Sequence, residues 1–482
     1  MGSVAVSIHA GDGKTVKSML ESVRDGKTKP TLVTRNGMVL GASGPGAVPT
    51  ESADGKLAIL FSGDLYNADK LRPLLRPAPK SDSYAEIVMG LYKMKGIECV
   101  HYLDGPFTFV LIDGDEFYAA RDPLGVKPFY FAKRDNGWLF ASELKAFSND
   151  VKKVAEFPPG RYLDSKAALH RYYKIPETTA KSVNVSDAVD LIRALVTDSI
   201  EKRIQPSGEV GIYLTGTLES CIIAALAAER VKKIRTYSVG LAGSADGHTA
   251  KRVASWLSTD HTHIEVSEQE ALDSLQTVVT GLESFDAGIV RHAVADYFAI
   301  REAAPQISAL VGSDGANELF GGYAYLRPMF SEKLSHELMA ITRDLHRTHL
   351  LRWERMTSMF GVEARSPFVD RKLVHAAFHL PANLKINEEG RSKWILRRAF
   401  STILPAWVVD RPDNDDTFNV GIQTSLEEYA ASVFTDEDLA KDKQTREALN
   451  LRTKDEMLYY RIWSAKFPPE YVNLVGRTQL PA

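Results

Sequence analysis

Residues 211–221 constrain the fold of this chain more than any other stretch. Residues 211–214 form a short apolar run typical of a buried strand, and residues 218–229 are rich in Ala, Leu and Ile, as in a buried helix. The tight turn between them, residues 215–217, brings free N–H groups to the positive end of the helix dipole, an arrangement that favours a phosphate. An ordinary βα connection would show the same pattern.

Beyond residue 186 the predicted helices and strands alternate. Helices are expected at 188–204, 218–229 and 249–257, and strands at 211–214, 234–239 and 262–266. This alternation predicts an α/β domain with a doubly wound parallel sheet, in which ligands bind beyond the carboxyl ends of the strands. The turn at 215–217 occupies such a position. After residue 268 the chain reads as mostly helical, apart from a strand at 308–311.

The first 150 residues have a different pattern, with short β-type runs separated by Gly, Asp and Asn turns. Strands are expected at 4–8, 31–34, 56–61, 107–112 and 117–120, and helices at 16–23 and 84–95. This mixture predicts an α+β sandwich. We therefore expect two domains, residues 1–175 and 186–475, joined by a polar segment.

Composition excludes several classes of function. The 482 residues carry a formal net charge of −3, with no basic excess to suggest nucleic acid. No apolar run reaches the roughly 18 residues that span a bilayer, and no signal peptide is recognisable. Two cysteines, Cys99 and Cys221, cannot form a disulfide framework or a zinc site. We expect a cytoplasmic protein that binds neither nucleic acid nor membrane.

Several motifs then follow one another along the chain. They are SGDLYN (62–67), LDGPF (103–107), ARDPLGVKP (120–128), ASELKA (141–146), GSDGANELFGGY (312–323), GVEARSPFVD (361–370) and KWILR (393–397). Together and in this order they resemble the glutamine-dependent asparagine synthetase family. The resemblance implies an N-terminal-nucleophile (Ntn) hydrolase-like glutaminase domain followed by a synthetase domain of the ATP-pyrophosphatase type. It also implies a reaction in which ATP adenylates a carboxylate, pyrophosphate leaves, and an amine displaces AMP.

The resemblance also implies site residues, with ATP and Mg²⁺ as cofactors. The nucleotide would be bound by Thr215, Gly216, Thr217, Ser220, Ser238, Val239, Gly240, Gly312 and Ser313. The metal ligands would be Glu219 and Asn317, and the catalytic residues Asp314 and Lys393.

The synthetase motifs depart from the family at five positions. Thr217 replaces a glycine, and we expect its β-branched side chain to resist a positive φ and close approach of a phosphate. Glu219 replaces a metal-binding Asp, Asn317 replaces a second one, and Asp314 replaces a Glu near the reacting carboxylate. Asp413 stands where a lysine is expected. Each of the three replaced acids keeps an oxygen, so weaker Mg²⁺ binding is still feasible.

The glutaminase motifs depart further. The family needs a cysteine directly after the initiator methionine, as nucleophile and, through its freed amine, as base. Here Gly2 and Ser3 occupy the N-terminus, Ser62 replaces an oxyanion-binding Asn, and Tyr84 replaces an acid that would hold the glutamine amine. The sequence therefore predicts a structural domain that does not hydrolyse glutamine.

Two functions follow from these observations. The first is an ATP-dependent, amide-forming ligase that works without glutamine on a small amino or carboxylic acid, including an intramolecular reaction as in the β-lactam synthetases. The second is a catalytically inactive pseudoenzyme that serves as a scaffold or nucleotide-binding partner. A homodimer is compatible with the sequence but is not implied by it.

Overall fold

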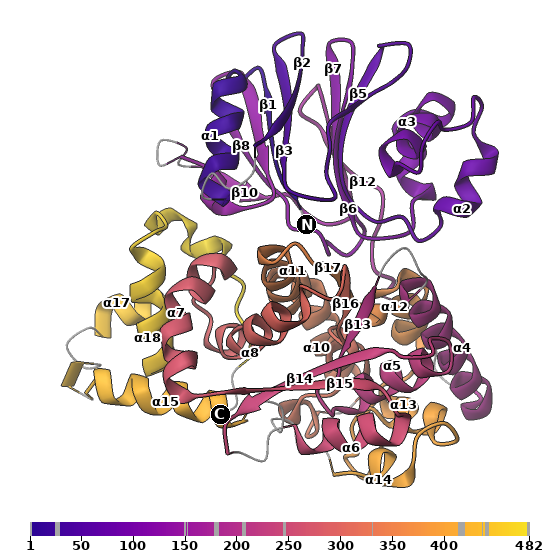
Figure 1. Cartoon of the computed structure of the whole chain (residues 1–482), viewed down its shortest axis with the longest axis vertical. Helices are drawn as coiled ribbons and strands as arrows, with labels where there is room; N and C mark the ends of the chain where they lie inside the picture. The colour runs from indigo at the N-terminus through magenta and orange to yellow at the C-terminus, as the bar shows by residue number, and fades with distance from the viewer. Residues whose placement is uncertain are drawn as a thin grey trace. The chain divides into compact units, whose positions relative to one another are not determined.

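The structure is a computed structural model that describes residues 2–24, 29–148, 151, 153–177, 183–204, 209–243, 247–329, 331–412, 420–435, 437–438 and 443–479. The chain divides into two compact units, Met1–Lys174 and Ile175–Ala482 (Figure 1). No helix in the described ranges combines the length and the hydrophobicity that crossing a bilayer requires.

The first unit is a sandwich of two antiparallel sheets, ordered β10-β8-β9-β1-β3-β2 and β12-β11-β7-β6-β5-β4. The strands are β1 (Ser3–Ile8), β2 (Thr31–Arg35), β3 (Met38–Ser43), β4 (Thr50–Glu51), β5 (Leu57–Gly63), β6 (Phe107–Asp113), β7 (Glu116–Arg121), β8 (Tyr130–Arg134), β9 (Gly137–Ala141), β10 (Val154–Glu156), β11 (Arg161–Asp164) and β12 (Leu169–Arg171). The helices are α1 (Gly13–Arg24), α2 (Ala68–Leu71), α3 (Tyr84–Lys95), η1 (Arg72–Leu74), η2 (Gly96–Tyr102) and η3 (Leu144–Ala146).

Strand alternation divides the apolar side chains of this unit between two cores. Leu60 and Val110 face the other sheet and share a core with Val6 and Phe140. Their strand neighbours, such as Ile59, point to the opposite face and pack against α3. Figure 1 accordingly shows α1 and α3 on opposite sides of the strands.

The strand β3 was not predicted from the sequence, because Gly41 interrupts its apolar run. A Cβ atom at Gly41 would lie 2.4 Å from Val16 and 3.1 Å from Leu20. Both neighbours belong to α1, so the glycine lets this helix pack directly on the strand. This close packing explains why a glycine stands in β3, although it interrupts the apolar pattern from which a strand would be predicted.

The second unit contains a parallel sheet ordered β15-β14-β13-β16-β17. Its strands are β13 (Val210–Tyr213), β14 (Arg235–Leu241), β15 (Asp260–Val266), β16 (Ala309–Val311) and β17 (Glu363–Arg365). The strand order reverses between β13 and β16, and this switch point is where ligands bind in such sheets.

Helices cover this sheet and extend beyond it. They are α4 (Val185–Ile204), α5 (Leu218–Ala228), α6 (His248–Leu257), α7 (Glu268–Leu282), α8 (Ala287–Ala303), α9 (Ala316–Phe320), α10 (Ser331–Asp344), α11 (His349–Met359), α12 (Arg371–His379), α13 (Trp394–Phe400), α14 (Ala406–Val409), α15 (Val420–Val433), α17 (Lys443–Ala448) and α18 (Lys454–Ser464). Short 3₁₀ turns are η4 (Ala324–Leu326), η5 (Leu345–Arg347), η6 (Pro367–Val369), η7 (Ala382–Leu384) and η8 (Pro469–Leu474).

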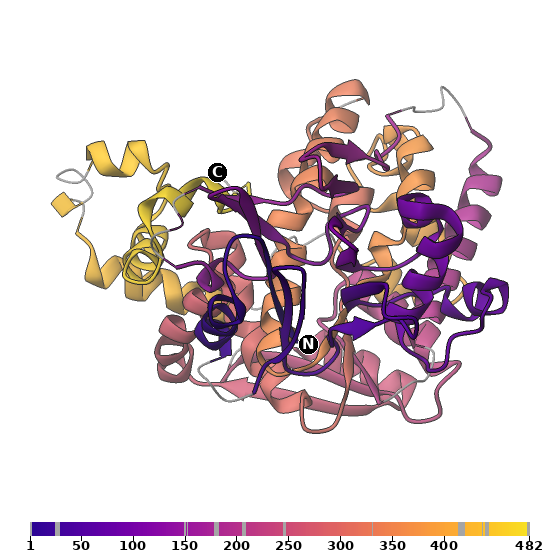
Figure 2. The ribbon, with the colours of Figure 1, turned by 90° about the horizontal axis from the view of Figure 1, so that it is seen from above.

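The helices of the second unit fall into layers. Figure 1 shows α6 and α8 on opposite sides of β14 and β15, and both helices contact these strands. Near the C-terminus, α15 and α18 pack on α7 and α8 and form the separate yellow group of Figure 2. The predicted fold class, an Ntn-type sandwich followed by a doubly wound parallel sheet with a helical C-terminal part, is confirmed.

The ARDPLGVKP motif stabilises the first unit through a buried arginine. Arg121 is fully buried and donates hydrogen bonds to the backbone oxygens of Lys127 (2.7 Å), Gly125 (2.9 Å) and Phe157 (2.6 Å). Its guanidinium also donates to Glu156 at 2.8 Å. The motif therefore joins β7 to the end of β10 and to the segment that connects β10 with β11.

Replacement of Arg121 by Met is expected to destabilise the first unit by about 3–5 kcal/mol, because it leaves a carboxylate and three carbonyl oxygens without their donor. The matched control is Met at Arg171, which is exposed on β12. Urea unfolding, combined with hydrogen exchange of peptides from β7 and β11, measures the effect. Equal stability of the two variants would contradict this role for Arg121.

Candidate active site

The turn after β13 brings the candidate site to the switch point of the parallel sheet. Gly216 has a φ of +85°, a conformation that side-chain-bearing residues rarely adopt. A Cβ atom there would also lie 3.0 Å from Thr249 and 3.1 Å from the backbone of Ala250, at the start of α6. Glycine is required at this position both by the turn and by the helix packed against it.

The expected conflict between Thr217 and a positive φ does not arise in this turn. Thr217 is the N-cap of α5 with a φ of −68°, so the left-handed conformation falls on Gly216 alone. The hydroxyl of Thr215 lies 3.1 Å from those of Thr217 and Ser220. Thr217 makes no side-chain capping bond to α5, so its hydroxyl does not occupy the N–H groups that begin the helix. An anion can still be bound there.

A buried ion pair faces this turn. The carboxylate of Glu219, only 4% exposed, accepts a hydrogen bond from the Lys393 ammonium at 2.7 Å. Burial would raise the pKa of Glu219, but the Lys393 charge and the hydrogen bonds that the carboxylate accepts together outweigh burial and lower the pKa below its ordinary value. Glu219 is therefore ionised and already partly neutralised.

Lys393 owes its position to an unusual backbone conformation. Its φ of +52° and ψ of +30° place it in the left-handed region as the N-cap of α13. Its N–H donates to the carbonyl oxygen of Phe320, the last residue of α9, at 3.1 Å. The backbone of Lys393 is thus fixed between the end of α9 and the start of α13. A non-glycine residue in a strained backbone conformation often marks a functional position.

Asn317, at the start of α9, lies beside this ion pair. Its Oδ1 is buried and has no hydrogen-bond donor within the described part of the chain. A Cβ atom at Gly322 would lie 2.0 Å from this oxygen and 2.5 Å from Lys393 Cε, so Gly322 is needed for the close approach. An orphaned amide oxygen beside the Glu219 carboxylate fits one side of a Mg²⁺ ion, whose remaining ligands are usually phosphates and water.

These side chains line one small pocket of about 60 Å³. From the sequence-predicted site it contains Gly216, Thr217, Glu219, Asn317 and Lys393. The structure brings these residues together from β13–α5, from α9 and from the segment before α13.

Asp314 belongs to a buried charge cluster that the sequence did not reveal. Arg352 on α11 donates to Asp314 through Nη2 and to Asp296 of α8 through Nη1. Burial and the charge of Asp314 raise the pKa of Asp296 to about 7, although Arg352 opposes this shift. Burial also raises the pKa of Asp314, again against Arg352. The guanidinium of Arg352 thus balances the negative charge of Asp314.

Five other predicted residues lie on β14 or directly after β16 and do not line this pocket. Ser238, on β14, places its hydroxyl 2.8 Å from His263 Nδ1 and 3.1 Å from His261 Nε2. Val239 and Gly240 continue the same strand. Gly312 and Ser313 follow β16, and a Cβ atom at Gly312 would lie 2.8 Å from Trp353, whose ring stacks on Tyr213.

A second cation, the guanidinium of Arg411, contacts the turn that follows β13. Arg411 donates a hydrogen bond to the carbonyl oxygen of Gly216 at 2.9 Å and lines the same pocket. Sequence analysis did not reveal this contact, and only the proximity of Arg411 to Asp413 pointed to this part of the chain. Asp413 itself lies outside the described residues.

Gly2, at the position of the family's N-terminal cysteine, packs closely against the backbone of the first unit. A Cβ atom at Gly2 would lie within 3.1 Å of the carbonyl oxygens of residues 43–45. Ser3 is buried and donates its hydroxyl to Glu143 at 2.8 Å, and Tyr84 packs edge-on against Phe61. Cys99 is fully buried, and burial raises its pKa to about 12, which disfavours a reactive thiolate.

Comparison with known proteins identifies the group to which this chain is related. The asparagine synthase family model matches residues 191–340 and 327–461, and a glutamine amidotransferase domain model matches residues 28–195. The chain belongs to the asparagine synthetase family. Its membership rests on both units, because the two models together extend over most of the sequence.

Individual relatives from the asparagine synthetase family support this assignment. A probable glutamine-hydrolyzing asparagine synthetase of Schizosaccharomyces pombe is 31% identical over 474 residues, covering 90% of this chain and 85% of the relative. A second, from Dictyostelium discoideum, is 30% identical over 92% of this chain and 87% of the relative. The asparagine synthetase of Zea mays is 29% identical over 88% and 77%, respectively.

The ion pair of this asparagine synthetase family member can be tested by a double-mutant cycle. Replacement of Lys393 by Met leaves Glu219 buried without its partner, and we expect a loss of about 3–5 kcal/mol in the free energy of unfolding. Because Glu219→Gln removes the other charge, the double variant should lose much less than the sum of the two single losses. Urea denaturation measures all four proteins. Additive losses would contradict the pairing.

Proposed function

We propose that the second unit catalyses ATP-dependent formation of an amide bond. A carboxylate oxygen of the substrate attacks the α-phosphorus of ATP, the bond to the bridging oxygen breaks, and pyrophosphate leaves. An amine nitrogen then attacks the acyl carbon, AMP leaves with the bonding electrons of the C–O bond, and the nitrogen loses a proton. The observation that supports this proposal most is the pocket at the start of α5, where Glu219, Asn317 and Lys393 meet.

Each residue has a chemical role in this proposal. The N–H groups at the start of α5 and the hydroxyls of Thr215 and Ser220 bind the nucleotide phosphates. The Lys393 ammonium stabilises the negative charge that develops on pyrophosphate. Asp314, with its charge balanced by Arg352, orients the acyl substrate or its amine. Mg²⁺ accompanying ATP would be held by Glu219 and Asn317 and would neutralise phosphate charge.

We further propose that the amine does not come from glutamine. Both cysteines of the chain, Cys99 and Cys221, are buried, and burial raises each pKa to about 12. The Ser3 hydroxyl is bound to Glu143, and Gly2 has no space for a side chain. Free ammonia, or an amine within the substrate as in the β-lactam synthetases, would then supply the nitrogen. The named relatives are glutamine-hydrolyzing enzymes, so this chain would differ from them.

A second candidate function is a nucleotide-binding scaffold without catalysis. The pairing of Lys393 with Glu219, and of Arg352 with Asp314, favours it, because each charge needed for the chemistry is already neutralised by a protein partner. In an active enzyme the phosphates and the substrate must compete for these groups. The two candidates therefore differ in turnover and not in the architecture of the site.

Pyrophosphate exchange separates the two candidates. With ATP, Mg²⁺ and a panel of amino-dicarboxylic acids, we expect incorporation of labelled pyrophosphate into ATP, and amide formation on addition of ammonium. Glutamine should neither replace ammonium nor release glutamate. Absence of exchange with every acid would overturn the ligase and leave the scaffold. Release of glutamate from glutamine would overturn the proposal on the amine source alone.

A further inference from the structure

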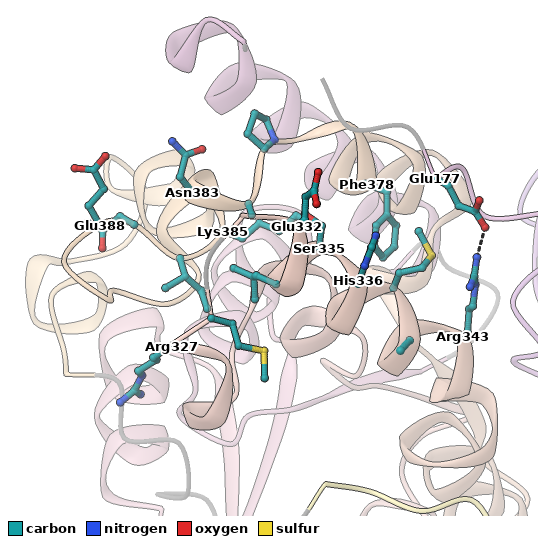
Figure 3. A pocket seen from close by; sticks show the side chains of 18 residues that line it. Glu177, Arg327, Glu332, Ser335, His336, Arg343, Phe378, Asn383, Lys385 and Glu388 are labelled. Carbon is teal, nitrogen blue, oxygen red and sulfur yellow. Dashed lines mark hydrogen bonds and ion pairs between the residues drawn. The ribbon is translucent and has the colours of Figure 1, made fainter. Parts of the chain in front are cut away.

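A second cavity, separate from the nucleotide pocket, lies in the same unit (Figure 3). It encloses about 1110 Å³, ample for a small organic ligand, and shares no lining residue with the pocket at the start of α5. Its walls come from α10, from the end of α12, and from η7 with the segment that follows it. Figure 3 shows Lys385, Glu332, Ser335, His336 and Phe378 around this space.

Lys385 is the unusual member of this wall. Only 2% of the residue is exposed, and the described part of the chain offers its ammonium no ion pair. The Nζ atom of Lys385 lies over the ring of Phe378, 4.7 Å from the ring centroid. The Lys385 backbone is held by hydrogen bonds to the carbonyl oxygen of Ala382 and from the N–H of Trp394. Burial lowers its pKa to about 7.

The acidic residues of the cavity do not neutralise this lysine. Glu177 is paired with Arg343. Glu332 and Glu388 are exposed, and neither contributes to the pKa of Lys385. A buried ammonium without a counter-ion is costly for the free protein, and an anion that enters the cavity would offset this cost.

Apolar side chains form one part of the remaining wall, beside polar residues such as Ser335, Asn383 and Asn387. Leu334, Met339, Phe378 and Ile386 are each less than 9% exposed and line the cavity together with Met329. Methionine side chains adapt to ligands of different shape. A ligand that satisfies both the apolar wall and the lysine needs an apolar body and one anionic group.

We propose that this cavity binds a small molecule with an apolar body and a single carboxylate, for which the Lys385 ammonium is the counter-ion. The proposal does not depend on catalysis at the nucleotide pocket. Arg327 and His336 line the same cavity and are further groups that a carboxylate could approach, as are the polar side chains of Ser335, Asn383 and Asn387.

Isothermal titration with 4-phenylbutyrate and with 4-phenylbutan-1-ol tests the proposal on the full chain. We expect 4-phenylbutyrate to bind at least about tenfold more tightly than the alcohol of the same skeleton, because only the carboxylate can pair with Lys385. Lys385→Met should abolish this preference, because Met keeps an unbranched apolar side chain but carries no charge. Lys333→Met is the matched control, because Lys333 is exposed on α10 and does not line the cavity.

The pH dependence provides a second, mutation-free measurement. A lysine is charged below its pKa, so affinity for 4-phenylbutyrate should fall as the pH rises from 6 to 9, whereas affinity for the alcohol should not change. The same decrease in His336→Gln would assign it to Lys385 and not to the histidine. Equal affinities for acid and alcohol in the wild type, or unchanged preference in Lys385→Met, would overturn the proposal. Weak binding of both probes would overturn it as well.

Discussion

The Lys393–Glu219 ion pair is the interaction on which the synthetase site depends. It links the first turn of α5 to the residue that begins α13, two segments 174 positions apart in the chain. The backbone N–H of Lys393 also reaches Phe320, the last residue of α9, the short helix that begins beside Asn317 and is followed by Gly322. One buried contact therefore fixes the distances among the phosphate-binding turn, the amide oxygen and the cation.

The same pairing limits how the site can work. A carboxylate and an ammonium in contact leave little net charge for an incoming polyanion, and Arg352 has the same effect on Asp314. Binding of a nucleotide must then redistribute these contacts, with the ammonium turning towards phosphate and the carboxylate towards a metal. Turnover after this redistribution separates a ligase from a scaffold, because both would bind the nucleotide and retain the fold.

Local sequence features predicted much of this architecture. The period-two runs of the first unit and the alternation of strands and helices in the second gave the fold class, since both patterns are local. The turn at Gly216 was also recognisable, because strand, glycine and helix follow one another directly. The sequence did not show that the left-handed conformation of this turn is needed at Gly216 and not at Thr217.

Long-range partners were not predictable in the same way. Arg352 contacts Asp296 across 56 positions, and Lys385 lies in a cavity formed by segments far apart in the sequence. Nothing in a single sequence marks which of its many arginines and lysines are buried. Their environment follows from helix packing, so the charge balance of Asp314 and the isolation of Lys385 emerge only from the structure.

Titration calorimetry with ATP tests the central claim most directly, namely that a nucleotide binds at the start of α5 through Glu219 and the adjacent turn. The wild-type protein should bind ATP more tightly with Mg²⁺ than without it. Glu219→Gln should lose this metal dependence, whereas Glu229→Gln, at an exposed position just after the same helix, should keep it. Absence of ATP binding up to about millimolar concentration, or metal dependence unchanged in Glu219→Gln, would contradict the account.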